Sequence, residues 1–318
     1  MNASPTTPSP APSPGRGQRI RSCVVAGGSG AVGGLFGEAL ASAGIDVCLT
    51  DLVPAATVPP GARLMPGDIT APHGALRTAL AAADLVLLAV PEQTALDAVP
   101  ALVGLLRPES LLADTLSVKT RFAAEVAARM PGQQAVGLNP MFAPSLGMAG
   151  RPVAATVLAE GPLVGDLFEL VAEHGGRVVR MTPERHDRMA AASQTLTHAT
   201  VLAFGQALAE LDVDIDELAA VAPPPHATLL ALLARIVSGT PEVYWDIQSA
   251  NPLADDARDA LARGVGRVRE LARDGDEEAF AKNLRELSGV LGPRLPHYRD
   301  LCAELFARIP AADTEETP

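Results

Sequence analysis

The sequence predicts an α/β fold in which a doubly wound sheet is followed by an all-α C-terminal domain. Short apolar runs alternate with helical patterns through the first half, and several runs are continuously apolar, as in strands that helices cover on both faces. The pattern changes at Thr182-Pro183-Glu184, where Thr182 is a suitable N-cap and Pro183 suits the first helical turn. Only helical patterns follow, so the 318-residue chain is expected to form two domains.

Strands and helices are predicted to alternate before Thr182, which favours a mostly parallel sheet. The predicted strands are Ser22–Ala26, Asp46–Thr50, Leu85–Val90, Leu111–Asp114, Gln134–Gly137, Val153–Val157 and Arg177–Met181. The predicted helices between them are Gly33–Ala43, Ala75–Ala82, Thr94–Leu105 and Thr120–Arg129. The predicted C-terminal helices are Pro183–Leu211, Ala227–Ser238, Tyr244–Ser249, Asp255–Asp274, Glu277–Leu291 and Tyr298–Arg308.

A glycine-rich turn joins the first predicted strand to the first predicted helix. Gly28, Gly30 and Gly33 form the pattern G-x-G-x-x-G. We expect Gly28 to permit a tight turn, Gly30 to let the backbone approach a pyrophosphate, and Gly33 to allow close packing of helix on strand. The helix then directs its N-terminal N–H groups at the phosphates, which predicts a Rossmann-type dinucleotide-binding domain. The residues expected at the cofactor are Gly28, Ser29, Gly30, Ala31, Val32 and Gly33.

An acidic residue stands where such a domain binds the adenosine ribose. Asp51 follows the second predicted strand, roughly 20 residues after the glycine turn, as this position requires. No arginine stands beside it to accept a 2′-phosphate, so we predict NAD rather than NADP as the cofactor. Val90 and Pro91 end the third strand at the same edge of the sheet and are expected to line the nicotinamide or adenine side. The alternative is a plain strand terminator.

These patterns divide the chain into four expected segments. Residues 18–182 form the dinucleotide-binding domain, and residues 183–310 form a helical domain that binds the substrate. The long apolar helices of that domain are hard to bury within one subunit, so we expect a homodimer. Residues 1–17 are rich in proline and are expected to form a disordered tail, and residues 311–318 a flexible end.

The composition excludes several classes of partner. The net charge of −12 and the lack of basic clusters argue against nucleic acid. No apolar run reaches membrane-spanning length and the N-terminus lacks the apolar core of a signal peptide, so we expect a cytoplasmic protein that does not contact membranes. Cys23, Cys48 and Cys302 have no metal or redox spacing and the six histidines are scattered, so no metal site is predicted.

Four segments together resemble the prephenate dehydrogenase family of aromatic amino-acid biosynthesis. They are GGSGAVGGLFGEAL, DTLSVK, GLNPMFAPS and the pair SQTLTHAT with ARIVSGTPEVYWDI, and they occur in this order between about residues 20 and 300. The resemblance implies transfer of a hydride from C4 of a cyclohexadienyl ring to NAD. The ring carboxylate leaves as carbon dioxide and the ring becomes aromatic. A hydroxyacid-dehydrogenase or imine-reductase type of protein fits these segments poorly.

The resemblance also assigns residues in the N-terminal half. Ser117, in DTLSVK, matches the serine that hydrogen-bonds the C4 substituent and the catalytic base, with a helix N-cap as the alternative. Lys119 fits a role in holding the serine loop, with a surface lysine as the alternative. His186 is expected to be a structural residue of the helix that links the domains.

Three residues of the helical half match the substrate-binding residues of the family. Arg235, in ARIVSG, matches the arginine that clamps a substrate carboxylate, for which a guanidinium is suited because it binds in a bidentate manner. The alternative is a helix-surface arginine. His198 matches a histidine near the substrate, with a buried structural histidine as the alternative. Tyr244 matches an aromatic position near the active-site entrance, which the partner subunit of a dimer can contribute.

One position departs from the family pattern. The family motif is typically HPMFGP, and its histidine serves the hydroxyl chemistry, whereas this sequence has Asn139 in GLNPMFAP. Ser145 also replaces an acid found nearby in some members. Asparagine does not titrate and cannot act as a general base. The enzyme can be crippled or use another base, it can have lost catalysis, or its substrate can carry a C4 group that needs no base.

The chemistry favours a different C4 group. A C4 hydroxyl loses its proton as the hydride leaves, whereas the lone pair of a neutral amine expels the hydride and forms an iminium directly. The Asn139 oxygen can accept one amine N–H, while an imidazolium beside an ammonium would be repulsive. We therefore predict oxidation of 4-amino-4-deoxyprephenate to 4-aminophenylpyruvate, a step towards 4-aminophenylalanine in antibiotic biosynthesis. The alternatives are a prephenate or arogenate dehydrogenase of tyrosine biosynthesis and a non-catalytic NAD-binding sensor.

Overall fold

The computed structural model describes residues 20–53 and 57–309. The predicted tail at residues 1–17 and the predicted flexible end at residues 311–318 lie outside the described residues. Internal packing divides the chain into two compact units, residues 1–186 and 187–318. The division falls inside helix α6 (Pro183–Ala190), four residues after the change of pattern that the sequence shows at Thr182. We call these the sheet unit and the helical unit.

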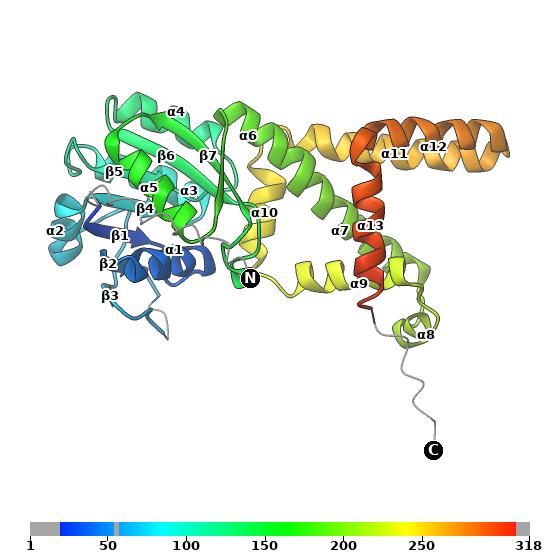
Figure 1. The fold of residues 1–318 in the computed structure, drawn as a ribbon, viewed down its shortest axis with the longest axis horizontal. Helices are drawn as coiled ribbons and strands as arrows, with labels where there is room; N and C mark the ends of the chain where they lie inside the picture. Colours follow the sequence, from blue (N-terminus) through cyan, green and yellow to red (C-terminus); the bar gives the residue numbers. More distant parts are fainter. Residues whose placement is uncertain (1–19, 54–56, 310–318) are drawn as a thin grey trace, which may run out of the picture. The chain divides into compact units, whose positions relative to one another are not determined.

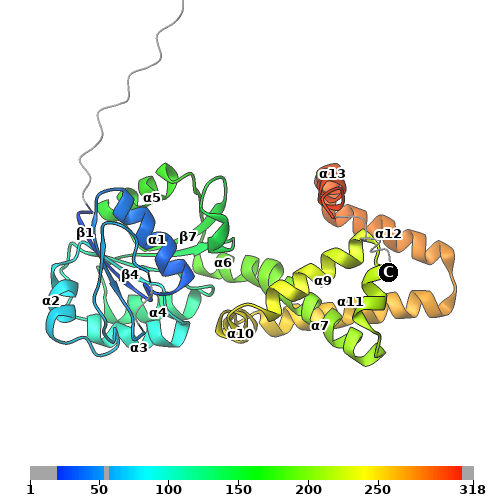
Figure 2. The same ribbon diagram turned by 90° about the horizontal axis from the view of Figure 1, so that it is seen from below.

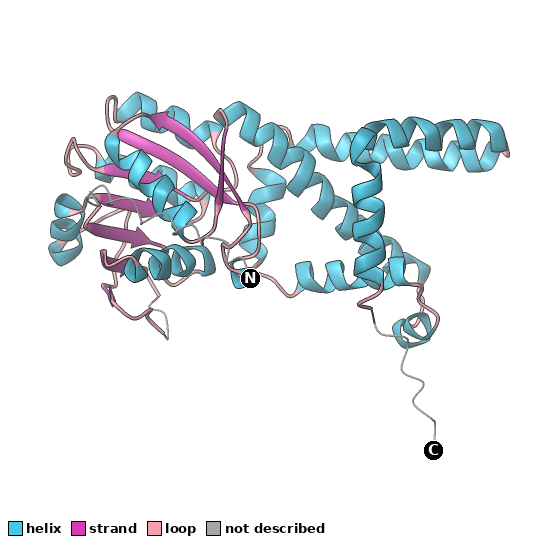
Figure 3. Ribbon diagram, in the orientation of Figure 1, coloured by secondary structure: helices cyan, strands magenta, loops and turns pink. Residues whose placement is uncertain are grey.

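The sheet unit contains one eight-stranded sheet with the strand order β3-β2-β1-β4-β5-β6-β7-β8 (Figures 1 and 3). All neighbouring strands run parallel except β6 and β7, which are antiparallel. This architecture confirms the predicted doubly wound, mostly parallel sheet. The strands are β1 (Ser22–Ala26), β2 (Asp46–Thr50), β3 (Ala62–Leu64), β4 (Leu85–Leu88), β5 (Leu111–Asp114), β6 (Gln134–Pro140), β7 (Pro152–Ala159) and β8 (Arg177–Arg180).

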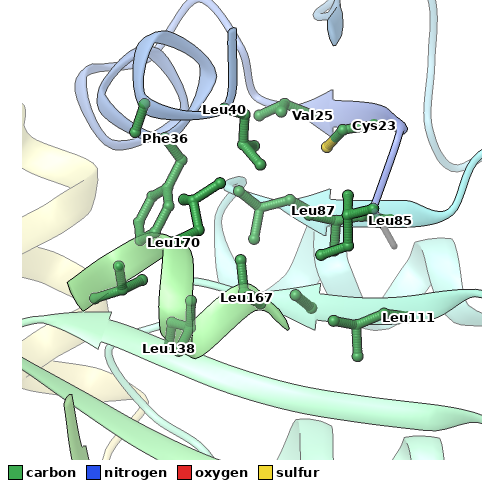
Figure 4. Packing of buried hydrophobic residues seen from close by; sticks show 14 of the residues in the cluster. Cys23, Val25, Phe36, Leu40, Leu85, Leu87, Leu111, Leu138, Leu167 and Leu170 are labelled. Carbon is green, nitrogen blue, oxygen red and sulfur yellow. The ribbon is translucent and has the colours of Figure 1, made fainter. Parts of the chain in front are cut away.

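Helices cover both faces of the sheet, and each face has its own apolar core. Helices α1 (Ala31–Ser42) and α5 (Pro162–Glu173) pack on one face, and α2 (Gly74–Ala82), α3 (Glu92–Leu102) and α4 (Thr120–Arg129) pack on the other (Figure 2). Figure 4 shows side chains of α1 and α5 directed onto apolar side chains of the strands. Full burial stabilises each such side chain by about 1.5–3 kcal/mol. Strands buried on both faces explain the continuous apolar runs of the sequence.

One strand and one α-helix of the sheet unit are absent from the sequence prediction. Strand β3 is a short edge strand with no apolar run, so no periodicity marks it. Helix α5 starts at Gly161-Pro162 and contains Gly165, which are turn signals by composition. Pro162 nevertheless suits the first helical turn, and the buried leucines of the helix follow at helical spacing.

A boundary of β6 matters for function. The predicted strand ends at Gly137, whereas β6 continues to Pro140 and pairs with β7 from Ala135 to Pro140. Asn139 therefore lies within a buried strand, paired with Ala154 of β7, and not in a loop. Its backbone is fixed by the sheet before any side-chain contact is considered.

The described part of the helical unit has no strand, in agreement with the predicted all-α domain. Its first helix is interrupted by a π-helical segment, Ala191–Thr195, before α7 begins. None of the described helices is long and apolar enough to cross a membrane. After the π-helical segment come α7 (Leu196–Leu211), α8 (Ile215–Ala220), α9 (Pro224–Val237), α10 (Pro241–Ser249), α11 (Ala254–Asp274), α12 (Glu277–Leu291) and α13 (Leu295–Phe306).

Candidate active site

The glycine turn after β1 is packed too tightly for side chains. A Cβ on Gly33 would lie 2.1 Å from the carbonyl oxygen of Gly27, which agrees with the predicted close packing of helix on strand. The tight turn is predicted at Gly28, whereas the residue with left-handed backbone in this turn is Gly27, with φ of 77°. A Cβ on Gly28 would instead lie 2.7 Å from Cβ of Leu49 in β2. Gly28 is thus needed for close approach and Gly27 for the turn.

The start of α1 presents unshielded backbone N–H groups. Its N-cap is Gly30, which supplies no side-chain hydrogen bond, and its first turn contains no acidic residue. An open helix N-terminus of this kind favours a phosphate through its N–H groups and its dipole. A hollow of about 450 Å³ adjoins this turn. Its lining includes Gly28, Ser29, Gly30, Gly34, Val58 and Pro59. The residues present therefore fit the pyrophosphate of a dinucleotide.

Asp51 lies directly beside the glycine turn, as the ribose-binding role requires. The backbone N–H of Ser29 donates to Oδ2 of Asp51 at 3.2 Å, and the Ser29 hydroxyl donates to the carbonyl oxygen of Val53 at 2.8 Å. These bonds fix the carboxylate at the end of β2. Carboxylate oxygens accept from ribose hydroxyls, and the negative charge repels the additional phosphate of NADP. The geometry fits NAD.

Val90 and Pro91 lie at the same edge of the sheet. A Cβ on Gly27 would come within 3.1 Å of Cγ1 of Val90, so the half-buried Val90 side chain lies against the glycine turn. Pro91 is exposed and is the N-cap residue of α3. Strand β4 ends at Leu88, so the predicted strand end at Val90 is wrong and Pro91 does not terminate the strand. The position of Val90 against the turn is compatible with a place beside the cofactor.

A buried ion pair organises the loop that carries Ser117. The ammonium of Lys119 donates to Oδ1 of Asp114 at the end of β5 and, at 2.9 Å, to the carbonyl oxygen of Leu138 in β6. Both side chains are only 1% exposed, so the alternative of a surface lysine is wrong. Burial raises the pKa of Asp114 above its ordinary value, and the Lys119 cation offsets part of that rise. The loop from residue 115 to 119 is closed by this contact.

Gly137 makes room for that ion pair. A Cβ on Gly137 would lie 2.9 Å from Oδ2 of Asp114 and 2.9 Å from Cδ of Lys119. Only a residue without a side chain fits between the pair and Thr156 of β7. This glycine in the middle of a strand is explained by the groups it leaves space for.

Ser117 is half-buried in the loop between β5 and α4. The N-cap of α4 is Lys119, and this cap has no side-chain hydrogen bond, so the helix-cap alternative for Ser117 is wrong. The serine follows a fully buried strand at the carboxyl edge of the sheet, where ligands bind in doubly wound folds. Ser145 is exposed in a short 3₁₀ helix, Pro144–Leu146.

Asn139 is hydrogen-bonded to a histidine that sequence reasoning treats as structural. The side-chain amide N–H of Asn139 donates to Nε2 of His186 in α6, with 3.0 Å between the nitrogens. Asn139 is 3% exposed and His186 is 1% exposed. His186 also lies near enough to Asp114 to interact with its carboxylate electrostatically. The histidine is therefore part of the same buried polar cluster as the loop lysine.

In the helical unit the three predicted substrate residues come together. The rings of His198 and Tyr244 meet edge to face with centroids 5.1 Å apart, and the Tyr244 hydroxyl donates to the carbonyl oxygen of Arg235 at 3.3 Å. Burial, and after it the Arg235 cation, hold the pKa of His198 below its ordinary value. His198 is therefore a neutral imidazole at pH 7. Arg235 is exposed, although its helix is apolar in sequence.

The π-helical segment adds a residue that the sequence analysis does not single out. Oε1 of Gln194 and Nδ1 of His198 are buried atoms with no hydrogen-bond partner among the described residues. Buried polar atoms are normally paired, so these two atoms suit a polar ligand. The segment is held by Thr195, whose hydroxyl donates to the carbonyl oxygen of Ile247 and whose carbonyl accepts from Gln248 of α10. π-helical turns are frequent at functional sites.

Most of the residues that meet within each unit are among those predicted from the sequence. Sequence reasoning misses the left-handed Gly27, the contact of His186 with Asn139, and Gln194. The doubled glycine was the available signal for Gly27, and spacing of one helical turn from His198 was the signal for Gln194. No local signal links His186 to Asn139, because the two residues are distant in sequence and meet only in the folded sheet unit.

Two family models match the chain. A model described as the prephenate dehydrogenase nucleotide-binding domain matches residues 69–160, and one described as the prephenate dehydrogenase dimerization domain matches residues 182–286.

Individual proteins give a consistent result. A 4-amino-4-deoxyprephenate dehydrogenase of Streptomyces pristinaespiralis is 54% identical over 287 residues, which cover 90% of this chain and 97% of that protein. A probable arogenate/prephenate dehydrogenase of Methanocaldococcus jannaschii is 27% identical, covering 66% of this chain and 48% of that protein. The structure of an A. aeolicus prephenate dehydrogenase with hydroxyphenyl propionate and NAD+ has a TM-score of 0.70 at 18% identity, with coverage of 86% and 98%, and shows the shared fold.

The Asp51 carboxylate is predicted to contribute to cofactor affinity and choice. In Asp51→Asn the charge is lost while the shape is kept, so the KM for NAD should rise about 10- to 100-fold, as for loss of a charge-assisted hydrogen bond. The ratio of the KM for NADP to the KM for NAD should fall in the same variant. Asp46→Asn, on the exposed end of the same strand, is the matched control and should leave both KM values unchanged. An unaltered NAD KM in Asp51→Asn would refute the assignment.

The buried ion pair yields a stability prediction. Lys119→Met leaves the Asp114 carboxylate buried and unpaired, which should lower the free energy of unfolding by about 3–5 kcal/mol at pH 7. Without Lys119 the folded-state pKa of Asp114 rises further, so the variant should be least destabilised at acid pH and lose stability as pH rises through that pKa. Urea unfolding at pH 5 and pH 7 measures this. Lys282→Met, at an exposed lysine, is the control, and equal losses in both variants would contradict the prediction.

Proposed function

The chain belongs to the prephenate dehydrogenase family, and we propose that it oxidises 4-amino-4-deoxyprephenate to 4-aminophenylpyruvate with loss of carbon dioxide. It is an NAD-dependent dehydrogenase. The observation that carries the choice of substrate is Asn139, a residue that cannot take up a proton, in the position of the family histidine. The relative with 54% identity, which is named for the amino substrate, supports the same choice.

The reaction balances without a protein base. The lone pair of the neutral C4 amine forms a C=N bond as the C4 hydride leaves for NAD. The bond between C1 and the ring carboxylate then breaks, carbon dioxide departs, and the electron pair of that bond makes the ring aromatic and returns the nitrogen to an amine. No proton has to leave the substrate in either step. A nitrogen bears the transient positive charge readily, whereas a hydroxyl oxygen needs a base to take its proton as that charge develops.

Asn139 is proposed to recognise the amine. Its Nδ2 is engaged by His186, so its carbonyl oxygen Oδ1 serves as the acceptor for an amine N–H. An amide oxygen carries a partial negative charge, which stabilises the iminium as it forms. Because the amide stays neutral at every working pH, it does not repel a substrate amine that arrives as ammonium.

Other residues are proposed to hold the substrate. Ser117, in the loop closed by Lys119, offers a hydroxyl to the C4 substituent. In the helical unit Arg235 binds a carboxylate of the substrate, and the neutral His198 and Gln194 supply polar atoms that lack protein partners among the described residues. Tyr244 packs on His198 and limits the space beside it.

The cofactor is NAD, and the residues present fit it. We propose that the open N-terminus of α1 and the glycine turn bind the pyrophosphate and that Asp51 binds the adenosine ribose. Val90 borders the same turn, and we propose that Pro91, the next residue, also lines the cofactor. When bound, NAD accepts the hydride from C4, and the protein's part is to orient the ring and to keep the amine neutral.

We propose that the enzyme is a homodimer through its helical unit. Most of the exposed large apolar side chains among the described residues lie in this unit, and a mostly apolar hollow of about 920 Å³ opens along α11 and α12. The family model that covers this region is described as a dimerization domain. Sedimentation should give twice the chain mass of 32.8 kDa, and a monomer at micromolar concentration would contradict the proposal. The residues along this hollow include Leu261, Gly264, Val265, Val268, Leu287 and Val290.

A cytoplasmic location is proposed from the cysteines. Cys23 and Cys48 are buried and free, and Cys302 is exposed and free, as expected in a reducing compartment. Recovery of the protein in a secreted fraction of the producing cells would contradict this.

The substrate assignment is tested by parallel turnover. NADH formation is followed with 4-amino-4-deoxyprephenate and with prephenate, and the amino compound should be strongly preferred. Asn139→His should gain prephenate turnover on the order of 100-fold, with an acid limb from the new histidine, and should lose turnover of the amino compound. Asn139→Ala is the matched control, because it removes the amide without adding a base, and it should not gain prephenate turnover.

Each contrary outcome identifies one of the alternatives. Preference of the unaltered enzyme for prephenate or arogenate would indicate an asparagine-tolerant enzyme of tyrosine biosynthesis and require another base. Binding of NAD with turnover of none of these substrates would indicate a sensor.

A further inference from the structure

The Asn139 amide that is proposed to recognise the amine is itself hydrogen-bonded to His186. Both side chains are almost fully buried, and 3.0 Å separates Nδ2 of the asparagine from Nε2 of the histidine. In this bond the amide N–H donates and the histidine accepts. A histidine ring nitrogen accepts only when it carries no hydrogen, so Nε2 is the ring nitrogen without one in this contact.

The orientation of the amide decides what the substrate meets. The two ends of an asparagine side chain have nearly the same shape, but one end is an acceptor and the other is a double donor. With Nδ2 bound to His186, the opposite end of the group is the oxygen. If the amide turned over, its NH₂ group would face the C4 substituent. That would place donors against an amine that is becoming positively charged.

We propose that His186 is a positioning residue that fixes Asn139 as a hydrogen-bond acceptor and thereby sets the preference for an amine over a hydroxyl at C4. The inference rests on the proposed function. It requires no proton transfer. As positive charge develops on the substrate nitrogen, the amide oxygen becomes more negative, the amide N–H becomes a stronger donor, and Nε2 of His186 accepts it more strongly.

The surroundings of the pair fix the rest of Asn139. Its backbone lies in β6 and pairs with Ala154 of β7. The preceding carbonyl, that of Leu138, accepts from the Lys119 ammonium at 2.9 Å. The remaining freedom of Asn139 is the rotation of its amide, and the bond to His186 removes it. The strand and Lys119 thus hold the backbone of Asn139 in place. The bond to His186 determines that the amide oxygen, and not the NH₂ group, faces away from the histidine.

The experiment compares two replacements of His186. His186→Leu cannot accept a hydrogen bond, whereas His186→Gln offers a carbonyl oxygen as acceptor. With 4-amino-4-deoxyprephenate, kcat should fall on the order of 10-fold in His186→Leu and recover to within about threefold of the unaltered enzyme in His186→Gln. The ratio of amino to hydroxy turnover should fall in the leucine variant. The KM for NAD should stay constant, because the glycine turn is distant in the sheet from this contact.

A double-mutant cycle separates positioning from a merely structural role. In an Asn139→Ala background, His186→Leu should have no further effect on kcat, because there is no amide left to orient. Thermal unfolding and NAD affinity of each variant report on folding. If His186→Leu does not fold, His186→Met, whose flexible side chain adapts to the same space, replaces it.

The outcomes distinguish the two proposals. If the unaltered enzyme prefers the amino compound and His186→Leu keeps that preference, the positioning role is overturned and the proposed function stands. Equal losses with both substrates, persisting in the Asn139→Ala background, would also overturn it and indicate a structural histidine. If the unaltered enzyme does not oxidise the amino compound, both proposals fall.

Discussion

The part of the sheet unit that carries Ser117 and Asn139 depends on the buried ion pair of Asp114 and Lys119. An isolated buried charge is costly, so each of these side chains requires the other. Because Lys119 also binds the carbonyl of Leu138, the pair joins the end of β5, the loop with Ser117 and strand β6 in one polar cluster. Gly137 belongs to the same constraint, since a side chain there would occupy the space of the pair. Removal of any member disturbs all three segments.

The electrostatics of this cluster suit a positive charge that exists only briefly. The ion pair contributes no net charge, and the Asn139 amide is neutral. A permanent anion here would favour the ammonium form of the substrate, whose nitrogen has no lone pair with which to expel a hydride. A cation would oppose the iminium. An oriented amide dipole avoids both effects, because it stabilises the developing charge without binding the protonated amine strongly.

Local patterns predicted the sheet, the glycine motif and the residues at strand ends. Burial on both faces produces continuous apolar runs, and tight turns require glycine, so both features can be recognised within a few residues of sequence. The prediction fails where long-range packing decides. Helix α5 begins with residues that resemble a turn, and only its burial against α1 and the sheet makes it a helix. The burial of Lys119 and the partner of Asn139 follow from strands and helices that meet in space. The π-helical segment before α7 has no mark in composition.

The preference for an amine is therefore a property of two residues and not of position 139 alone. Replacement of a histidine by asparagine removes a base, but it leaves an amide that can present either end to the substrate. Specificity requires a second group that accepts from one end, and His186 supplies it in this chain. It follows that a family member with asparagine at this position, but without an acceptor in α6 facing it, would lose the base without gaining a defined amine acceptor. The motif around Asn139 is informative about substrate only together with the residue that orients it.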